Sequence, residues 1–176
     1  MSQKGEEKRL NSSCLLTSEV LEKIYGKGAR RCPSSDDQIS LVFSQSRSFD
    51  LVELEQLLES VGWSRRPMRR VRRALENSLI RVGLWLHDAR FPRLIGFARC
   101  TGDGVLEATV WDVAIHPLYQ GVGLGKLLME YILESLAEMG VERVTLFADP
   151  GVVDFYESQG WVLEPEGHRC SFWYAN

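Results

Sequence analysis

The sequence has no hydrophobic run that approaches the roughly 18 residues needed for a membrane-spanning helix. Its first residues, Met1–Arg9, are mostly polar or charged, and no apolar stretch of the signal-peptide type follows them. A membrane partner is therefore not expected, and the cytoplasm is the expected location.

Cysteine is sparse, and its four copies are widely separated. Zinc sites and redox pairs use cysteines at short, fixed spacings, and the chain contains no Cys-x-x-Cys pair. We therefore expect no metal and no redox pair, and a reducing compartment with free thiols is the simplest setting. Cys100 and Cys170 are interpreted as buried, unreactive thiols.

The chain also lacks the excess of basic residues that nonspecific nucleic-acid binding requires. Lysine and arginine total 21 against 24 acidic residues, and the net charge is −3. One basic cluster stands out and is interpreted as a solvated helix face; it consists of Arg65, Arg66, Arg69, Arg70, Arg72 and Arg73. A contact with nucleic acid, with the 3′-phosphate of a cofactor or with an acidic protein is the alternative.

A chain of 176 residues fits one domain. Residues 1–37 contain few apolar side chains and many charged and small ones, which predicts a flexible N-terminal extension with a short ordered piece around Val20–Tyr25. Residues 38–176 are predicted to form the single folded domain.

Hydrophobic periodicity predicts a mixed α/β fold. Strands are expected at 39–43, 79–87, 94–100, 106–115, 144–148 and 168–174, and helices at 49–61, 67–77, 123–139 and 152–159. The strand at 144–148 is expected to be buried. Asp50 is predicted to cap the first helix, and Pro67 to lie in the first turn of the second.

The most informative segment is Gln120–Lys126, Gln-Gly-Val-Gly-Leu-Gly-Lys, between a predicted strand and a predicted helix. Glycines let a ligand approach the main chain closely. The first amides of a helix have no partner within the helix and lie at the positive end of its dipole. Together these features predict an anion-binding site, to which Lys126 could add charge.

Two common phosphate-binding patterns do not fit this segment. The P-loop requires glycine where Gln120 stands and Ser or Thr where Leu127 stands. The dinucleotide pattern GxGxxG fails because the glycines are spaced two and two, and because the segment lies past the middle of the chain. A glycine-rich turn without a ligand is a further alternative.

A third pattern fits. Gln120-x-x-Gly123-x-Gly125 resembles the (Gln/Arg)-x-x-Gly-x-(Gly/Ala) signature of the GNAT N-acetyltransferase superfamily. The preceding segment Val113–Pro117 resembles the family's strand that ends in an x-Pro step. Downstream, Asp154–Trp161 resembles the family's (Phe/Leu)-Tyr-x-x-x-Gly-Phe segment, with Trp161 in place of phenylalanine.

Further segments resemble one branch of this superfamily, the cyanobacterial and plastid branch. They are Trp111-Asp112, Leu146–Asp149, Val152–Tyr156 and Phe172–Tyr174. The branch includes serotonin N-acetyltransferases and plastid enzymes that acetylate protein amines. Asp149 departs from the superfamily, which commonly has asparagine at this position, so the resemblance does not carry a role over to it.

The resemblance implies a GNAT-type fold, a mixed and mostly antiparallel central sheet flanked by helices in a single domain. It also implies transfer of an acetyl group from acetyl-coenzyme A (acetyl-CoA) to a primary amine. The loop amides would hold the diphosphate, and the backbone near Ile115 would bind the pantetheine arm as an added strand. The implied contacts are Val113, Ala114, Ile115, Gln120, Gly121, Val122, Gly123, Leu124, Gly125, Lys126 and Tyr156.

By the same resemblance, Tyr156 is the acid that protonates the leaving thiolate. A base is also needed, because a free alkyl amine is mostly protonated at pH 7. The candidates are Asp112 and Asp149, ranked equal, with Glu107 behind. Strand alternation places Asp112 on the face opposite Trp111, where burial would make it a stronger base.

Each of these carboxylates could instead bind the cationic amine or cap a helix. The candidate acceptor contacts are Trp111, Asp112 and Asp149. The favoured acceptor is an arylalkylamine such as serotonin or tryptamine, which a closed aromatic pocket would suit, whereas an open groove would suit protein N-termini or lysines. The alternative among proteins that are not enzymes is a non-catalytic coenzyme A-binding module. The sequence leaves open whether the chain forms a homodimer.

Overall fold

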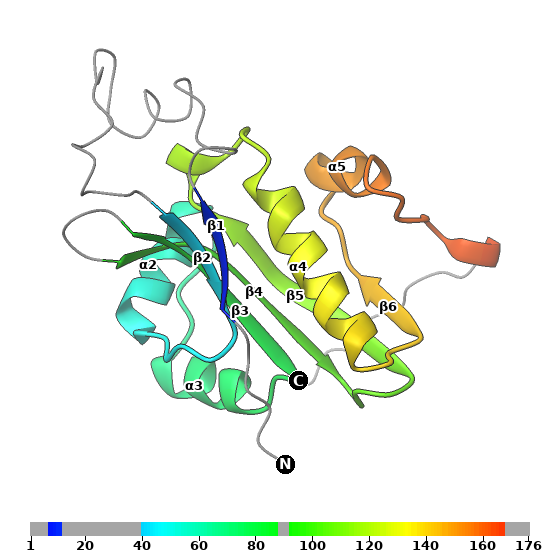
Figure 1. Ribbon diagram of the computed structural model, residues 1–176, viewed down its shortest axis with the longest axis horizontal. Helices are drawn as coiled ribbons and strands as arrows, with labels where there is room; N and C mark the ends of the chain where they lie inside the picture. Colours follow the sequence, from blue (N-terminus) through cyan, green and yellow to red (C-terminus); the bar gives the residue numbers. More distant parts are fainter. Residues whose placement is uncertain (1–6, 12–39, 88–91, 168–176) are drawn as a thin grey trace. The chain divides into compact units, whose positions relative to one another are not determined.

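The computed structural model describes residues 7–11, 40–87 and 92–167. Within these ranges six strands form one sheet in chain order (Figure 1): β1 (Lys8–Asn11), β2 (Ser40–Ser44), β3 (Ile80–His87), β4 (Pro92–Gly102), β5 (Glu107–Ile115) and β6 (Arg143–Leu146). Only β5 and β6 run parallel, and the other neighbours are antiparallel. The predicted fold class, a mixed and mostly antiparallel sheet, is confirmed.

The helices follow the predicted periodicity. They are α2 (Leu51–Ser60), α3 (Met68–Glu76), α4 (Leu124–Glu138) and the short α5 (Val153–Glu157), with 3₁₀ turns at Pro117–Tyr119, Pro150–Val152 and Pro165–Gly167. Contacts divide the chain into two parts, Met1–Leu146 with the sheet and α2 to α4, and Phe147–Asn176 with α5. The predicted strand at 168–174 and the predicted ordered piece at Val20–Tyr25 lie outside the described residues.

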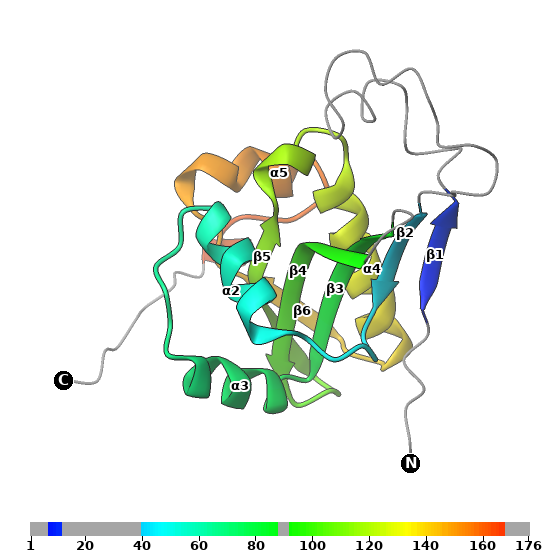
Figure 2. The same ribbon diagram turned by 90° about the vertical axis from the view of Figure 1, so that its left-hand side faces the viewer.

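Helices cover both faces of the sheet, with α2 and α3 on one side and α4 on the other (Figure 2). The Asp50 carboxylate caps α2 as predicted, accepting from the amide of Val52 at 2.7 Å. Pro67 is the residue before α3 rather than within its first turn, which corrects that prediction by one position. The core on this side contains Leu54, Leu57, Leu75, Trp85, Leu94 and Phe97.

The opposite face is covered by the apolar stripe of α4. Its buried side chains are Leu124, Leu128, Met129, Tyr131, Ile132 and Leu136. The Tyr131 ring stacks on Phe43 of β2 with ring centroids 5.4 Å apart. This packing fixes the start of α4, and with it the glycine segment, at the end of β5.

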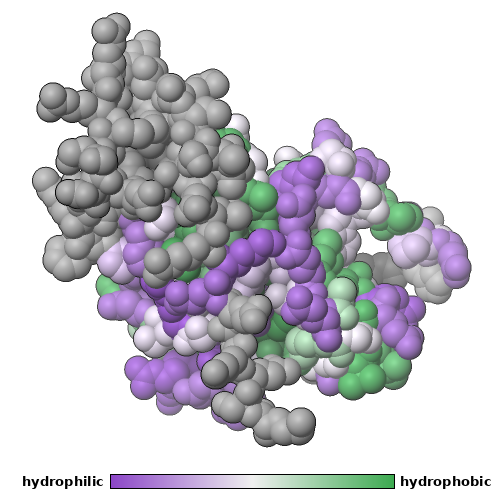
Figure 3. Space-filling model, in the orientation of Figure 1, coloured by the Kyte–Doolittle hydropathy of each residue, from purple (hydrophilic) through white to green (hydrophobic). Residues whose placement is uncertain are grey.

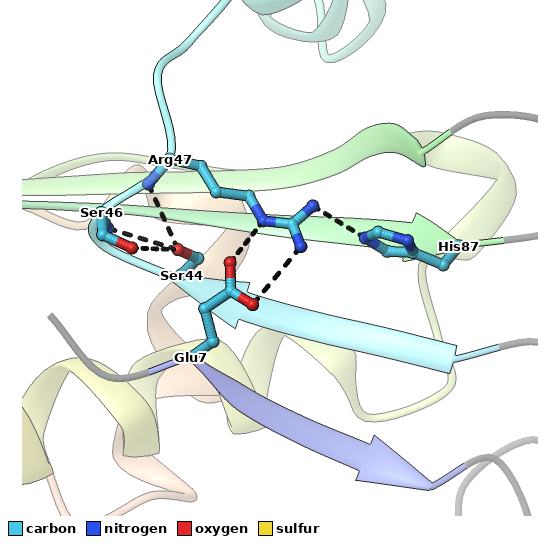
Figure 4. Close-up of polar contacts among 5 residues, drawn as sticks. All are labelled: Glu7, Ser44, Ser46, Arg47 and His87. Carbon is cyan, nitrogen blue, oxygen red and sulfur yellow. Dashed lines mark hydrogen bonds and ion pairs between the residues drawn. The ribbon is translucent and has the colours of Figure 1, made fainter.

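Strand β1 lies within the segment that was predicted to be a flexible extension, so that prediction is wrong for Lys8–Asn11. The strand pairs with β2, and Arg47 secures its start (Figure 4). Arg47 donates from Nε to Glu7 Oε1 at 2.7 Å and from a terminal nitrogen to His87 Nε2 at 2.8 Å. Its guanidinium also lies 5.4 Å from the ring centroid of Trp85.

The prediction of a buried strand at 144–148 is wrong in its bounds and in its burial. β6 covers Arg143–Leu146 and pairs only with β5, so it forms the edge of the sheet among the described residues. Its side chains alternate between exposed and half-buried. Among the described residues β6 has a neighbouring strand on one side only, and its side chains are less covered than those of the central strands β3 and β4.

Cys100 lies in β4 with no exposed surface, and burial raises the pKa of its thiol to about 12. At pH 8 only about one molecule in 10⁴ would carry the reactive thiolate. In a variant with Cys14, Cys32 and Cys170 replaced by serine, we expect no reaction with Ellman's reagent in the native state and full reaction in guanidinium chloride. Rapid labelling of the native variant would contradict the burial of this thiol.

No helix of the described residues has the length and apolar character required to cross a bilayer.

Candidate active site

A β-bulge interrupts β5 at Asp112. Phe97 pairs with Ala114, but Arg99 pairs with Trp111, so two residues of β5 stand opposite the single residue Ala98. Asp112 takes a left-handed backbone conformation with φ +54°, which few residues other than glycine, Asn and Asp tolerate. The bulge breaks the alternation of side chains along the strand.

Because of the bulge, the Asp112 side chain lies on the face of the sheet opposite to the one that strict strand alternation predicts. Asp112 Oδ2 accepts from Arg99 Nε at 2.6 Å, and Arg99 is the cross-strand neighbour of Trp111 and shares its face. The prediction that Asp112 lies on the face opposite Trp111 is therefore wrong. The Trp111 indole donates to Thr101 Oγ1 at 2.9 Å across the sheet.

Both oxygens of the Asp112 carboxylate are engaged by arginines. Besides the bond from Arg99, Oδ1 accepts from a terminal nitrogen of Arg66 at 3.1 Å. The Asp112 and Arg99 side chains are only 11% and 16% exposed, whereas Arg66 is 51% exposed. Asp112 is thus a paired ion with one inner and one outer arginine, the arrangement that lowers the cost of burying a carboxylate.

A cavity of about 350 Å³ lies beside this ion pair, beneath α2 and α3. Its apolar lining consists of Leu54, Leu58, Pro67, Val71, Ala74, Leu75 and Phe97, and its charged lining of Arg66, Arg70, Arg99 and Asp112. Among the residues that the structure describes, Phe97 is the one aromatic side chain in this lining, so the described wall of the cavity is apolar rather than aromatic. Trp111, a predicted acceptor contact, does not line it.

The arginine cluster divides into different environments. Arg65 pairs with Glu59, and Arg66 with Asp112. The other four are exposed and form no ion pair with any residue in the described part of the chain; they are Arg69, Arg70, Arg72 and Arg73. In Figure 3 the surface at the place of α3 in Figure 1 is strongly hydrophilic, as a solvated helix face requires.

Sequence reasoning missed that part of this cluster lines the cavity. The signal was available in the spacing, since Arg70 and Ala74 are one helical turn apart and their neighbours Val71 and Leu75 are apolar. All four line the cavity. Arg99 carried no such signal, because its neighbour Asp112 is brought to it only by the bulge.

The ladder between β5 and β6 ends well before β5 does. It pairs Glu107 with Arg143 at one end and Val110 with Leu146 at the other, whereas β5 continues to Ile115. Val113–Ile115 therefore extend beyond the parallel ladder, as an added-strand contact with a ligand requires. Glu107 lies at the opposite end of β5 and forms an ion pair with Arg143.

The glycine segment follows β5 after a tight turn that a side-chain hydrogen bond holds in place. Gln120 Nε2 donates to the carbonyl of Ile115 at 2.7 Å, which holds the loop to the end of the strand. Just upstream, His116 Nδ1 accepts from the amide of Leu118 at 3.3 Å, and burial, assisted by the charge of Arg93, lowers the pKa of His116. His116 is thus a structural cap of the 3₁₀ turn Pro117–Tyr119.

Gly121 and Gly123 adopt φ values of +76° and +85°, a region that favours glycine. Gly123 immediately precedes α4, and no side chain caps the helix. The first bond of the helix runs from the amide of Leu127 to the carbonyl of Gly123 at 3.1 Å, so the amides of 124–126 precede it. A Cβ at Gly123 would meet nothing within 4 Å.

These features fit a diphosphate. The amides lie at the positive end of a 15-residue helix, and the space beside Gly123 is open. Gly125 and Val122 are half-buried, whereas Gln120, Gly121 and Gly123 are exposed. Lys126 Nζ lies 3.8 Å from Glu130 Oε1 in an exposed pair, which constrains it little.

Tyr156 and Asp149 belong to the second part of the chain. Tyr156 lies in α5, is 8% exposed and contacts the rings of Phe155 and Trp161 edge-on. Burial raises the pKa of the Tyr156 phenol, and the negative charge of Asp149 raises it further. The phenol is therefore protonated at neutral pH, as a proton donor must be.

Asp149 is exposed and directly precedes the 3₁₀ turn Pro150–Val152. Its main-chain carbonyl accepts from the Val152 amide at 3.0 Å, but its side chain makes no capping bond. Its carboxylate is thus less engaged than that of Asp112. Among residues 7–11, 40–87 and 92–167, no group of three or more His, Cys, Asp or Glu side chains is placed to hold a metal ion.

A sequence model of the Acetyltransferase (GNAT) family matches residues 49–161. The chain belongs to the GNAT acetyltransferase family. The match extends over both parts of the chain, and the resemblance found in the glycine segment and around Tyr156 is confirmed. This acetyltransferase is an enzyme of a family that uses acetyl-CoA as its acetyl donor.

Relatives agree with the cyanobacterial and plastid branch predicted from the sequence. An "Uncharacterized N-acetyltransferase ycf52-like" of Prochlorococcus marinus is 67% identical over 90% of this chain and 88% of its own. "Histone acetyltransferase TAP1" of Glycine max is 41% identical over 77% and 62%. "Serotonin N-acetyltransferase 2, chloroplastic" of Oryza sativa subsp. japonica is 39% identical over 74% and 66%.

Among solved structures, the GNAT family N-acetyltransferase YhbS of Escherichia coli in complex with CoA matches with a TM-score of 0.61. It is 21% identical, and the match covers 75% of this acetyltransferase and 74% of YhbS. At this level of identity, the likeness shows the shared fold.

Proposed function

We propose that this acetyltransferase acetylates a small arylalkylamine such as tryptamine or serotonin, with acetyl-CoA as donor. The observation that carries the proposal is the apolar cavity beneath α2 and α3. At about 350 Å³, it has the size of a pocket for one small ligand with an aromatic body. The rice relative, named as a serotonin N-acetyltransferase, adds support.

The donor would be held at the start of α4. The amides of Leu124, Gly125 and Lys126 would bind the diphosphate, with Gln120 and Gly121 shaping the loop around it. The main chain of Val113–Ile115 would bond the pantetheine arm beyond the end of the β5–β6 ladder. The donor supplies the acetyl thioester, and the protein would position the two substrates and transfer the protons.

Tyr156 would give its phenol proton to the sulfur that leaves as the amine nitrogen bonds to the acetyl carbon. Asp149 would accept the proton that the nitrogen loses, because its carboxylate is less engaged than that of Asp112. The two groups share the second part of the chain, and the charge of one already raises the pKa of the other. Asp112 would instead hold Arg66 and Arg99 beside the acceptor cavity.

Acetylation of protein N-termini or lysines is the alternative that the name of the soybean relative favours. The exposed arginines of α3 argue against a lysine-rich acceptor, because like charges repel it from the mouth of the cavity. A coenzyme A-binding module without catalysis is the remaining alternative.

Thiol release from acetyl-CoA with a panel of amines tests the proposal. The panel contains tryptamine, serotonin, a lysine-rich histone-tail peptide and a peptide with a free N-terminus. We expect kcat/KM for tryptamine or serotonin to exceed that for either peptide by at least about 100-fold, or about 2.7 kcal/mol. Faster release with a peptide would favour the protein acceptor, and donor binding without release on any amine would favour the module.

A further inference from the structure

The acceptor cavity has an excess of positive charge. The charged groups in its lining are Arg66 from the linker after α2, Arg70 from α3, Arg99 from β4 and Asp112 from β5. Helix α2 contributes only Leu54 and Leu58 to this lining. Counted over the described residues of the lining, three cations and one carboxylate leave a net charge of two positive units around an apolar space.

This charge is permanent and is only partly compensated. Asp112 is already shared between Arg99 and Arg66, whereas Arg70 forms no ion pair with any described residue. Arginine does not lose its proton at any pH that a protein tolerates, unlike lysine. The chain has no lysine between Lys27 and Lys126, and the basic side chains in the described lining of this cavity are all arginines.

A permanent positive field has a chemical consequence for an amine acceptor. An ammonium ion cannot attack a thioester, and a free alkyl amine in water has a pKa of about 10, so about one molecule in 10³ is neutral at pH 7. Nearby cations disfavour the ammonium form, the same effect that activates lysines placed beside another positive group.

We propose that Arg70, together with the Arg66–Asp112–Arg99 cluster, stabilises the unprotonated form of the bound acceptor amine and so supplies part of the activation usually assigned to a general base. This inference rests on the proposed function, because it requires that the amine bind in this cavity. Asp112 then holds two of the arginines in place and is not the group that takes the proton.

The geometry argues against the opposite assignment, in which Asp112 attracts the ammonium form. Each oxygen of Asp112 already accepts from a guanidinium group, so the negative charge that would attract an ammonium is shared between two arginines before the amine arrives. An incoming ammonium would also approach the unmatched charge of Arg70 at the cavity lining. Arg70 is therefore a positioning residue that acts through charge.

The test is the pH dependence of the single-turnover rate with saturating tryptamine and acetyl-CoA. In Arg70→Gln we expect the apparent pKa of the rising limb to increase by about 0.5 to 1 unit, as one charge at a partly solvated site would produce. The rate at pH 7 would then fall by about 3- to 10-fold, while the plateau at high pH stays that of the unmodified enzyme.

Two further variants separate charge from structure. Arg70→Lys should restore the original profile near neutrality because it keeps the charge. Arg72→Gln removes an exposed arginine of the same helix that does not line the cavity, and it should leave the profile unchanged. Because Arg70 is exposed, raising the salt concentration should bring the profile of the unmodified enzyme toward that of Arg70→Gln.

The outcomes distinguish this inference from the proposed function. If the unmodified enzyme acetylates tryptamine but Arg70→Gln leaves the pH profile in place or shifts it downward, the inference is overturned and the proposed function stands. If no arylalkylamine is acetylated at any pH, both are overturned. An upward shift in Arg70→Gln alone, restored by Arg70→Lys, supports the inference.

Discussion

Replacing Tyr156 with phenylalanine is expected to lower kcat by about 10²- to 10³-fold and to leave the Kd of acetyl-CoA within about twofold. The hydroxyl would act mainly in the transition state, by giving its proton to the departing sulfur. The substitution keeps the ring, which packs against Phe155 and Trp161. Steady-state kinetics and a donor-binding titration on the same variant measure the two quantities separately.

A matched control is Tyr131→Phe, which removes a hydroxyl from another buried tyrosine that packs on Phe43 in the core. We expect its kcat to change by less than about threefold. A similar loss in both variants would mean that a buried tyrosine hydroxyl matters only for folding. Unchanged turnover in Tyr156→Phe alone would remove Tyr156 from the reaction.

The pH dependence gives a second check on Tyr156. Its pKa is raised by burial and by the charge of Asp149, so the phenol keeps its proton to a higher pH than a free tyrosine does. Any alkaline decline of kcat that this group causes in the unmodified enzyme should therefore lie above the ordinary titration range of tyrosine. In Asp149→Asn the pKa of Tyr156 should fall, and any alkaline decline of kcat should move to lower pH.

Replacing Gly123 with leucine is expected to weaken acetyl-CoA binding by about 100-fold or more, or about 2.7 kcal/mol. The φ of +85° would cost a branched residue about 1–2 kcal/mol of stability. The larger effect is on the donor, because the new side chain would stand in the open space at the start of α4. Isothermal titration with acetyl-CoA, together with thermal unfolding, measures both.

Gly140→Leu is the control for backbone strain. Gly140 follows the other end of α4 with φ +83°, and an added Cβ there would also meet nothing within 4 Å. Both variants should lose similar stability, but only Gly123→Leu should lose donor affinity. Equal donor affinity in the two variants would mean that the loop at Gly123 does not contact the donor.

The helices and most strands could be predicted from the sequence because their signals are local. The apolar spacing of α4 and the Asp50 cap of α2 depend on residues within a few positions of one another. The loop from Gln120 to Lys126 was found for the same reason, since its glycines and the following helix are contiguous.

The parts that were missed depend on partners far along the chain. The bulge at Asp112 arises from the register between β4 and β5, and no local pattern marks it. It brings Asp112 into contact with Arg99, which is 13 positions away in the sequence, and with Arg66, which is 46 positions away. The burial of β6 and the pairing of β1 likewise depend on which strands lie at the edges of the sheet.

The most direct test of the donor site is a crystal structure of the enzyme with bound acetyl-CoA. We expect diphosphate oxygens within hydrogen-bonding distance of the main-chain amides of Leu124, Gly125 and Lys126, beside Gly123. A donor bound elsewhere, with these amides facing only solvent, would contradict the account of how this acetyltransferase holds its substrate.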